Sequence, residues 1–404
     1  ERNLKVPARL AEEIARVTSR AQGVWAQARE SEDVAAFLPV LTEVVALRRE
    51  EGAAIAAGGD AYDALLDDYE PGTRSADIAA IFARLRPRLV ALRERLRAAP
   101  PAPVLRGTFP EEGQMRLARE VAAAFGYDFA RGRLDKAVHP FSSGSGLDVR
   151  ITTRTSPSDP FNCIYSTIHE VGHATYEQAV DAAHLLTPVG QGASMGVHES
   201  QSRLYENQLG RSRAFAGWLF GRMRDLFGDF GIAEEDGFYR AVNAVRDGFI
   251  RTEADEVQYN LHIMLRFDLE QALMRGDLRV GELEAAWNDR FLQDFGLAVA
   301  RPSDGMLQDV HWSVGLFGYF PTYALGNVYA GGLHAALRAG VPELDAHLAR
   351  GEAGPAVAWL GERLQRHGSL RPPRETVAAA TGAEPDEGAL LAYLEEKFGA
   401  LAAG

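Results

Sequence analysis

Helical spacing of apolar residues runs through almost the whole of this 404-residue chain. Within residues 4–98, the leucines between positions 85 and 96 recur at the three- and four-residue intervals that put side chains on one helix face. Strand signals are confined to one short region, where residues 136–141 and 148–154 flank the small polar sequence Ser142–Gly146. The pattern predicts a mainly α protein with one small antiparallel β element.

Composition excludes several classes of protein. Hydrophobic residues make up 46% of the chain, enough for a large folded core, and there is no apolar run of the ~18 residues that a membrane span needs. The formal net charge of −13 argues against a nucleic-acid or anionic-membrane partner, because both attract a basic surface. The single Cys163 cannot form an internal disulfide, and the charged start lacks the apolar core of a signal peptide. We therefore expect a cytoplasmic protein.

The most informative motif lies in the segment after the β element. Ser158-Asp159-Pro160 is typical of a helix start, with a capping side chain and a proline in the first turn, and helical spacing continues to about Val180. This helix contains His169-Glu170-Val171-Gly172-His173, an H-E-x-x-H sequence. Two histidines four residues apart project from one helix face, so both imidazoles can bind a single zinc ion.

The glutamate between the histidines suits hydrolysis. A zinc ion acidifies a water molecule bound to it, and Glu170 lies where it can accept the proton of that water as a general base. The alternative is a pair of core histidines that share a face by coincidence. That interpretation must also bury Glu170 on a largely apolar helix, which is unfavourable without a metal or a partner.

A catalytic zinc site needs a third protein ligand. Glu177 lies on the same face but ~12 Å from His169 along the helix axis, too far to share the ion. The remaining candidates follow in the sequence: Asp181, His184, His198, Glu199 and Glu206. The Gly-rich loop of residues 188–193 lets a helix from Val197 to Leu209 turn back and present Glu199, with Glu206 as the next candidate.

Five further motifs accompany H-E-x-x-H: His139-Pro140-Phe141, Asp148-Val149-Arg150-Ile151-Thr152, His198-Glu199-Ser200-Gln201, Ile250-Arg251-Thr252-Glu253-Ala254-Asp255 and Gly305-Met306-Leu307-Gln308-Asp309-Val310-His311-Trp312. Together the six motifs resemble those of the thermostable carboxypeptidase (Taq-type) family of zinc metallocarboxypeptidases. They occur in the order found in that family, and the resemblance runs on towards the C-terminus.

The resemblance implies a large helical body with a deep central groove and the small β element beside the active-site helix. Residues 1–130 would form an N-terminal helical arm lining the groove, and residues 131–404 the catalytic region of the same fold. Family chains usually carry further helical residues before the point where Glu1 falls, so we expect an upstream segment to be missing. The family members commonly form homodimers.

The implied activity is removal of the C-terminal residue from peptides with a free C-terminus, with broad specificity. His169, His173 and Glu199 would hold Zn²⁺, or Co²⁺ in its place. An oligo-endopeptidase or dipeptidase that uses the same metal site is one alternative. A catalytically silent, truncated scaffold is another.

Two further groups of residues are expected to serve this chemistry. Arginine binds a terminal carboxylate through charge-assisted hydrogen bonds, and the candidates for this role are Arg150 and Arg251. A helix that contains Arg251 is predicted for residues 250–274. Each arginine has a structural ion pair as its alternative, such as Arg251 with Asp255. The residue His139 is expected to line the substrate cleft, with a plain loop histidine as the alternative.

The negative charge that develops on the substrate carbonyl calls for a hydrogen-bond donor besides the metal. The segment from His311 to Tyr323 resembles the stretch that supplies a histidine and a tyrosine donor in related enzymes. We assign His311 and Tyr323 to catalysis and Tyr319 to substrate binding. The spacing leaves open which tyrosine faces the metal, and a core aromatic cluster is the alternative for all three.

Overall fold

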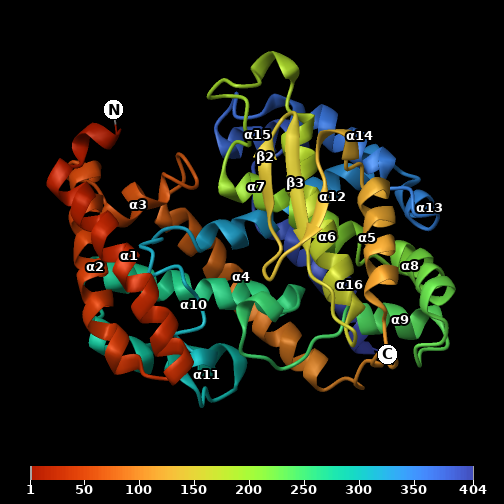
Figure 1. The fold of residues 1–404 in the computed structure, drawn as a ribbon, viewed down its shortest axis with the longest axis horizontal. Coiled ribbons are helices and arrows are strands. Elements are labelled where there is room, and N and C mark those ends of the chain that lie inside the picture. The colour runs from red at the N-terminus through yellow and green to blue at the C-terminus, as the bar shows by residue number, and fades with distance from the viewer. Residues whose placement is uncertain (1, 404) are drawn as a thin grey trace. The chain divides into compact units, whose positions relative to one another are not determined.

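A computed structural model describes residues 2–403, which are mainly helical with one three-stranded sheet (Figure 1), so the predicted fold class is confirmed. The chain forms two compact units. The first comprises the residues up to Glu94 together with Arg246–Ala324, and the second comprises Arg95–Val245 together with the residues from Leu325 onwards. The predicted division at residue 130 and the groove stay predictions.

The first unit is helical. Its main helices are α1 (Ala8–Ser31), α2 (Val34–Ala56), α3 (Ala61–Leu66), α4 (Ser75–Arg97, as far as Glu94), α10 (Glu256–Arg275) and α11 (Leu283–Phe295). Helices α1 and α2 pack along each other, and α10 packs against α2, α3 and α11. Helix α10 is buried along most of its length, so it forms the core of this unit.

The second unit contains the sheet and the remaining helices. Its elements are α5 (Glu111–Ala124), β1 (Leu134–Lys136), β2 (Ser142–Ser145), β3 (Asp148–Thr153), α6 (Pro160–Ala179), α7 (Met195–Arg203), α8 (Arg213–Phe227), α9 (Glu235–Val242), α12 (Pro321–Gly340, from Leu325), α13 (Leu344–Leu348), α14 (Gly354–Arg363), α15 (Pro373–Thr381) and α16 (Gly388–Ala403). Helix α6 packs against α5, α7, β2 and β3, and Figure 1 shows the strands lying along it.

The β element differs from the prediction in its bounds and its pairing. Strand β2 occupies the Ser142–Ser145 segment that we expected to be a loop, and it pairs antiparallel with β3 across the short turn Gly146-Leu147. The predicted first strand, residues 136–141, is mostly irregular, and β1 pairs parallel with β3. Small polar residues are typical of turns, but in β2 none of the four side-chain positions is buried, so its pairing depends on backbone hydrogen bonds rather than on apolar side chains. The sheet is therefore mixed.

Helix α6 begins as the sequence predicts. The Asp159 side chain accepts a hydrogen bond from the Phe161 N–H at 3.1 Å, and Pro160 occupies the first turn. Within the helix, Gly172 allows α7 to approach closely, because a Cβ atom at that position would lie 2.5 Å from Cα of Ser202. Any larger residue would push α7 away from the face that bears the two histidines.

Two other helices differ from the prediction in detail. The segment expected to be one helix from Val197 to Leu209 is α7 followed by a π-helical turn, Leu204–Leu209. Helix α10 begins at Glu256 rather than at residue 250, because Asp255 caps it by accepting hydrogen bonds from the N–H groups of Val257 and Gln258. Among residues 2–403, no helix has both the length and the apolar character needed to cross a bilayer.

Candidate metal centre

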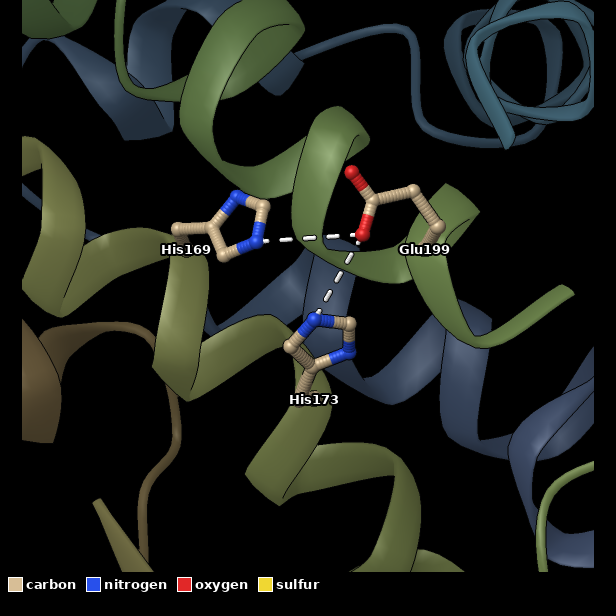
Figure 2. A group of neighbouring side chains, drawn as sticks. All are labelled: His169, His173 and Glu199. Carbon is tan, nitrogen blue, oxygen red and sulfur yellow. Dashed lines mark ion pairs between the residues drawn. The ribbon is translucent and has the colours of Figure 1, made fainter. Parts of the chain in front are cut away.

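Three side chains from α6 and α7 direct one atom each towards a common point. Figure 2 shows His169 and His173 turning a ring nitrogen towards the same oxygen of Glu199. Nε2 of His169 lies 3.8 Å from Oε2 of Glu199, and Nε2 of His173 lies 3.6 Å from it. All three atoms lie within 4.8 Å of one another.

These separations suit metal ligands. Two donors that each lie ~2.0–2.1 Å from a zinc ion in tetrahedral geometry are ~3.4 Å apart. The observed 3.6 and 3.8 Å are close to that spacing and too long for direct hydrogen bonds. Two imidazoles and one carboxylate are also the donor set of many catalytic zinc sites. The residues therefore fit a divalent metal.

The ring nitrogen of His169 that faces away from this point has its own partner. Nδ1 of His169 lies 3.0 Å from Oε2 of Glu206, which belongs to the π-helical turn after α7. The other oxygen of Glu206 accepts a hydrogen bond from Arg211 at 3.2 Å. π-Helical turns frequently occur at functional sites. This one places Glu206 beside Nδ1 of His169, while Glu199 faces Nε2 of the same ring.

The second oxygen of Glu199 is also engaged. Nε of Arg203, one turn further along α7, donates to Oε1 of Glu199 at 2.7 Å. This contact leaves Oε2 as the oxygen directed at the two imidazoles. Arg203 also approaches Glu206, with its Nη1 3.6 Å from Oε2, so one guanidinium lies between the two carboxylates.

Burial and neighbouring charges set the protonation of this centre. Burial, with the adjacent His198, holds the pKa of His173 well below its usual value, so this imidazole stays neutral with a lone pair available to a metal. Burial also lowers the pKa of His169, but the carboxylates of Glu199 and Glu206 outweigh it and raise the pKa. Burial raises the pKa of Glu170, which is 7% exposed, to about 7.

Glu206 remains ionised. Burial opposes its charge, but the hydrogen bond to His169 and the guanidinium groups of Arg211 and Arg203 hold the pKa of its carboxyl well below the usual range. The carboxylate behind His169 is thus a permanent negative charge and a strong acceptor for the Nδ1 proton. Such a partner fixes the ring orientation of a histidine ligand.

The first unit holds another predicted group, centred on Arg251. Its Nε and Nη2 donate to Oδ1 of Asp309 at 3.1 and 2.9 Å, and its Nη1 donates to the hydroxyl of Tyr259 at 3.2 Å. Arg251 is 5% exposed, and Arg266 pairs with the other oxygen of Asp309. The suggested ion pair of Arg251 with Asp255 is therefore wrong, since Asp255 caps α10 and the partner is Asp309.

His311, Tyr319 and Tyr323 lie close together in the same unit, which is compatible both with the assigned roles and with the alternative of an aromatic cluster. Nε2 of His311 lies 3.4 Å from the hydroxyl of Tyr323, and its ring centroid lies 5.6 Å from that of Tyr319. The guanidinium of Arg251 stands over the Tyr323 ring at 5.0 Å. Burial lowers the pKa of His311 to about 4, so its imidazole is neutral at pH 7 and can donate one hydrogen bond without a net charge.

The loop that bears His311 is held by a buried acid that the sequence did not single out. Glu270 on α10 accepts hydrogen bonds from Nε1 of Trp312 at 2.9 Å, from the N–H of Gly318 at 3.1 Å and from the hydroxyl of Tyr62 at 2.8 Å. Burial raises the pKa of Glu270 to about 7. Asp309 and Glu270 thus anchor both ends of this loop to α10.

Two predicted substrate residues lie on the surface of the second unit. Arg150 extends from the outer face of β3, where it donates two hydrogen bonds to Asp148 at 2.9 and 2.8 Å, and its side chain is 57% exposed. His139 is exposed in the segment between β1 and β2. Both side chains are accessible to a solute.

The supporting roles of several residues were missed in the sequence analysis. Glu206 follows Glu199 by seven residues, two helical turns, so the two share a helix face. Glu177 follows His173 by four residues on α6. In the sequence analysis, Glu206 was kept as the next ligand candidate and Glu177 was excluded by its distance. In the structure Glu206 contacts Nδ1 of His169, and Glu177 contacts His198. Arg203 and Glu270 gave no signal distinct from ordinary helix charges.

Comparison with known proteins gives a consistent result. Residues 1–398 match the family model described as Carboxypeptidase Taq (M32) metallopeptidase. Thermostable carboxypeptidase 1 of Thermus thermophilus is 44% identical over 99% of this chain and 81% of its own length. Carboxypeptidase 1 of Bacillus subtilis is 37% identical over 98% of this chain and 80% of its own length.

Solved structures agree. The M32 carboxypeptidase of Deinococcus radiodurans superposes with a TM-score of 0.96 at 40% identity, over 99% of this chain and 82% of that one. Metallocarboxypeptidase 1 of Trypanosoma cruzi gives a TM-score of 0.95 at 36% identity, over 98% and 81%. The chain therefore belongs to the Taq (M32) family of metallocarboxypeptidases and is a peptide hydrolase that depends on a divalent metal.

Proposed function

We propose that this chain removes the C-terminal residue of peptides with broad preference, using one metal ion held by His169, His173 and Glu199. The observation that supports the proposal most is the convergence of two Nε2 atoms and one carboxylate oxygen on α6 and α7, in a chain of this family. The ion is Zn²⁺, with Co²⁺ as the alternative, because the donor set is two imidazoles and a single carboxylate.

The metal supplies Lewis acidity, which polarises the scissile carbonyl and acidifies water. Glu170, between the two histidines on α6, accepts the proton of the attacking water and then delivers it to the leaving amine. Because Glu170 is 7% exposed, its carboxylate is poorly hydrated and accepts a proton readily. His311 and Tyr323 donate hydrogen bonds to the oxygen that gains negative charge, and Tyr319 contacts the substrate.

Recognition of the terminal carboxylate belongs to the same proposal. Arg150 and Arg251 bind it through charge-assisted hydrogen bonds, and His139 lines the substrate cleft. Asp309 and Tyr259 already orient the guanidinium of Arg251, and these contacts use three of its five N–H groups. Arg150 is exposed and exchanges Asp148 for the substrate.

Replacing either arginine by Ala should lower kcat/KM for free-acid peptides by about 10- to 100-fold, since a hydrogen bond to a charged group contributes ~1.5–3 kcal/mol. The rate for C-terminally amidated peptides should not change. The thermal midpoint should separate the two variants. Arg251→Ala breaks a buried ion pair and should destabilise the chain by on the order of 2–3 kcal/mol, softened by the remaining Arg266–Asp309 pair. Arg150→Ala should be nearly neutral.

Rates for matched free-acid and amidated peptides, measured on both variants, check this prediction. Selectivity is a ratio, so a loss of folded protein does not alter it. If the discrimination between acid and amide survives in both variants, neither arginine is the anchor for the carboxylate.

The proposed activity is tested with an N-acylated tripeptide and its C-terminal amide. We expect the metal-loaded chain to release one free amino acid from the acid and to cleave the amide far more slowly. Cleavage of the amide at a rate comparable to that of the acid, or release of a dipeptide, would point instead to an oligo-endopeptidase or dipeptidase. Mass spectrometry of the products distinguishes these outcomes directly.

The finer features of the proposal rest on the family resemblance. They are a homodimer, a groove that confines the peptide, and an arm of residues 1–130 that lines it beside a catalytic region of residues 131–404. The proposed cytoplasmic location rests instead on composition, chiefly the single Cys163. Size-exclusion chromatography with light scattering reports the oligomeric state. A panel of N-acylated dipeptides that differ only in the last residue reports the breadth of specificity.

A further inference from the structure

The two candidate histidine ligands have different partners behind them. His169 meets the carboxylate of Glu206 directly. Nδ1 of His173 instead lies 2.7 Å from Nδ1 of His198, the residue before Glu199. Nε2 of His198 in turn lies 2.9 Å from Oε1 of Glu177, which follows His173 by one turn of α6. His198 therefore lies between His173 and the carboxylate of Glu177, whereas His169 contacts its carboxylate directly.

The positions of the protons in this chain of contacts follow from the chemistry of imidazole. A nitrogen that faces a metal presents a lone pair, so the proton of a neutral His173 is on Nδ1. Two ring nitrogens at 2.7 Å need one donor and one acceptor, so Nδ1 of His198 accepts. The proton of a neutral His198 is then on Nε2, from which it is donated to Glu177. Each contact thus has one donor and one acceptor, and neither histidine has to carry a positive charge.

The ring of His198 is held in place from several sides. Its centroid lies 5.1 Å from that of Tyr176, whose hydroxyl accepts a hydrogen bond from the N–H of Ala193 at 3.1 Å. Gly192 passes against the ring, because a Cβ atom there would lie 2.6 Å from Cδ2 of His198. The N–H of Gly192 is also 3.4 Å from the same Glu177 oxygen. The Gly-rich loop before α7 thus fixes this imidazole.

We propose that His198 is a positioning residue for the metal: its Nδ1 accepts a hydrogen bond from the Nδ1–H of His173, and, held by Glu177, it keeps Nε2 of His173 directed at the ion. The inference rests on the proposed metal site and assigns His198 a role other than ligation. A hydrogen-bonded partner of this kind fixes the orientation of a histidine ligand, and its loss typically weakens metal binding 10- to 100-fold.

The test compares the zinc dissociation constants of two variants, measured by competition with a chromogenic chelator. His198→Leu fills much of the same space but cannot accept a hydrogen bond, and we expect the dissociation constant to rise about 10- to 100-fold. His198→Asn restores an acceptor oxygen near the position of Nδ1, so its dissociation constant should rise by less than ~10-fold. His334→Leu, which removes a buried imidazole that packs on Tyr393, is the matched control and should bind zinc as the unmodified chain does.

Thermal midpoints of the metal-free proteins show whether packing alone explains the result. Zinc affinity of His198→Leu equal to that of the unmodified chain would overturn the proposal, and so would equal losses for Leu and Asn. The readout does not involve hydrolysis. If the unmodified chain binds one zinc ion, and His198→Leu binds it more weakly, but no peptide is cleaved, the proposed function fails and the role of His198 stands. If the unmodified chain cleaves peptides and His198→Leu binds zinc with unchanged affinity, the proposed function stands and the role of His198 fails.

Discussion

Replacing Glu170 by Gln should remove most of the hydrolysis and leave the metal in place. Loss of a general base costs on the order of 10²–10⁴ in rate, because an amide cannot accept the proton of the attacking water. Metal binding should persist, because Glu170 is not one of the three residues whose donor atoms converge. The variant has almost the same shape, so α6 should keep its packing. Metal analysis and kcat/KM for a free-acid tripeptide, measured on one preparation, check both statements.

The matched control for this variant is Glu352→Gln. Glu352 pairs with Arg350 on the surface of the second unit, and its side chain is 52% exposed. The same change of functional group at that position should leave turnover unaltered. Full turnover in Glu170→Gln at equal metal content would show that another group accepts the proton.

Replacing Glu199 by Ala should have an equally large effect through the metal itself. Two histidines without the carboxylate form a weak site, so dialysed protein should retain far less than one ion per chain. A ligand that binds only the folded state stabilises it, by about 4 kcal/mol at a concentration of 1,000 times its dissociation constant. Added zinc should therefore raise the thermal midpoint of the unmodified chain and leave that of Glu199→Ala almost unchanged.

Two features of the structure sharpen this prediction. Arg203 loses its 2.7 Å contact in Glu199→Ala, so Glu199→Gln, which can still accept that hydrogen bond, separates the loss of a ligand from the loss of the ion pair. Glu206, the next candidate in the sequence, faces Nδ1 of His169, whereas Nε2 faces Glu199. Undiminished zinc in Glu199→Ala would show that a residue such as Glu206 turns to replace it.

The local features of the centre could be predicted from the sequence because they depend on neighbours in the chain. The cap of α6 follows from Asp159 and Pro160, and the shared face of His169 and His173 follows from helix geometry. Glu199 could be singled out because a Gly-rich loop allows the chain to reverse before α7. These inferences need only the periodicity of a helix and the freedom of a glycine.

Longer-range features could not be predicted in the same way. The partner of Arg251 is Asp309, 58 residues later, and a sequence offers no reason to prefer it over the nearby Asp255. The register of β2 depends on backbone pairing of small polar residues, which leave no apolar alternation to follow. The contact between His198 and His173 depends on the distance between α6 and α7, which Gly172 permits but does not specify.

The most direct test of the metal-dependent mechanism is a titration of hydrolysis with metal. The chain is stripped with a chelator, zinc is returned in steps, and bound metal and release of the C-terminal residue from an N-acylated tripeptide are measured in the same sample. We expect no release without metal, a rate that rises in proportion to occupancy, and a plateau at one ion per chain. Release at the full rate by the stripped chain, or a fully loaded chain that releases nothing, would contradict the mechanism.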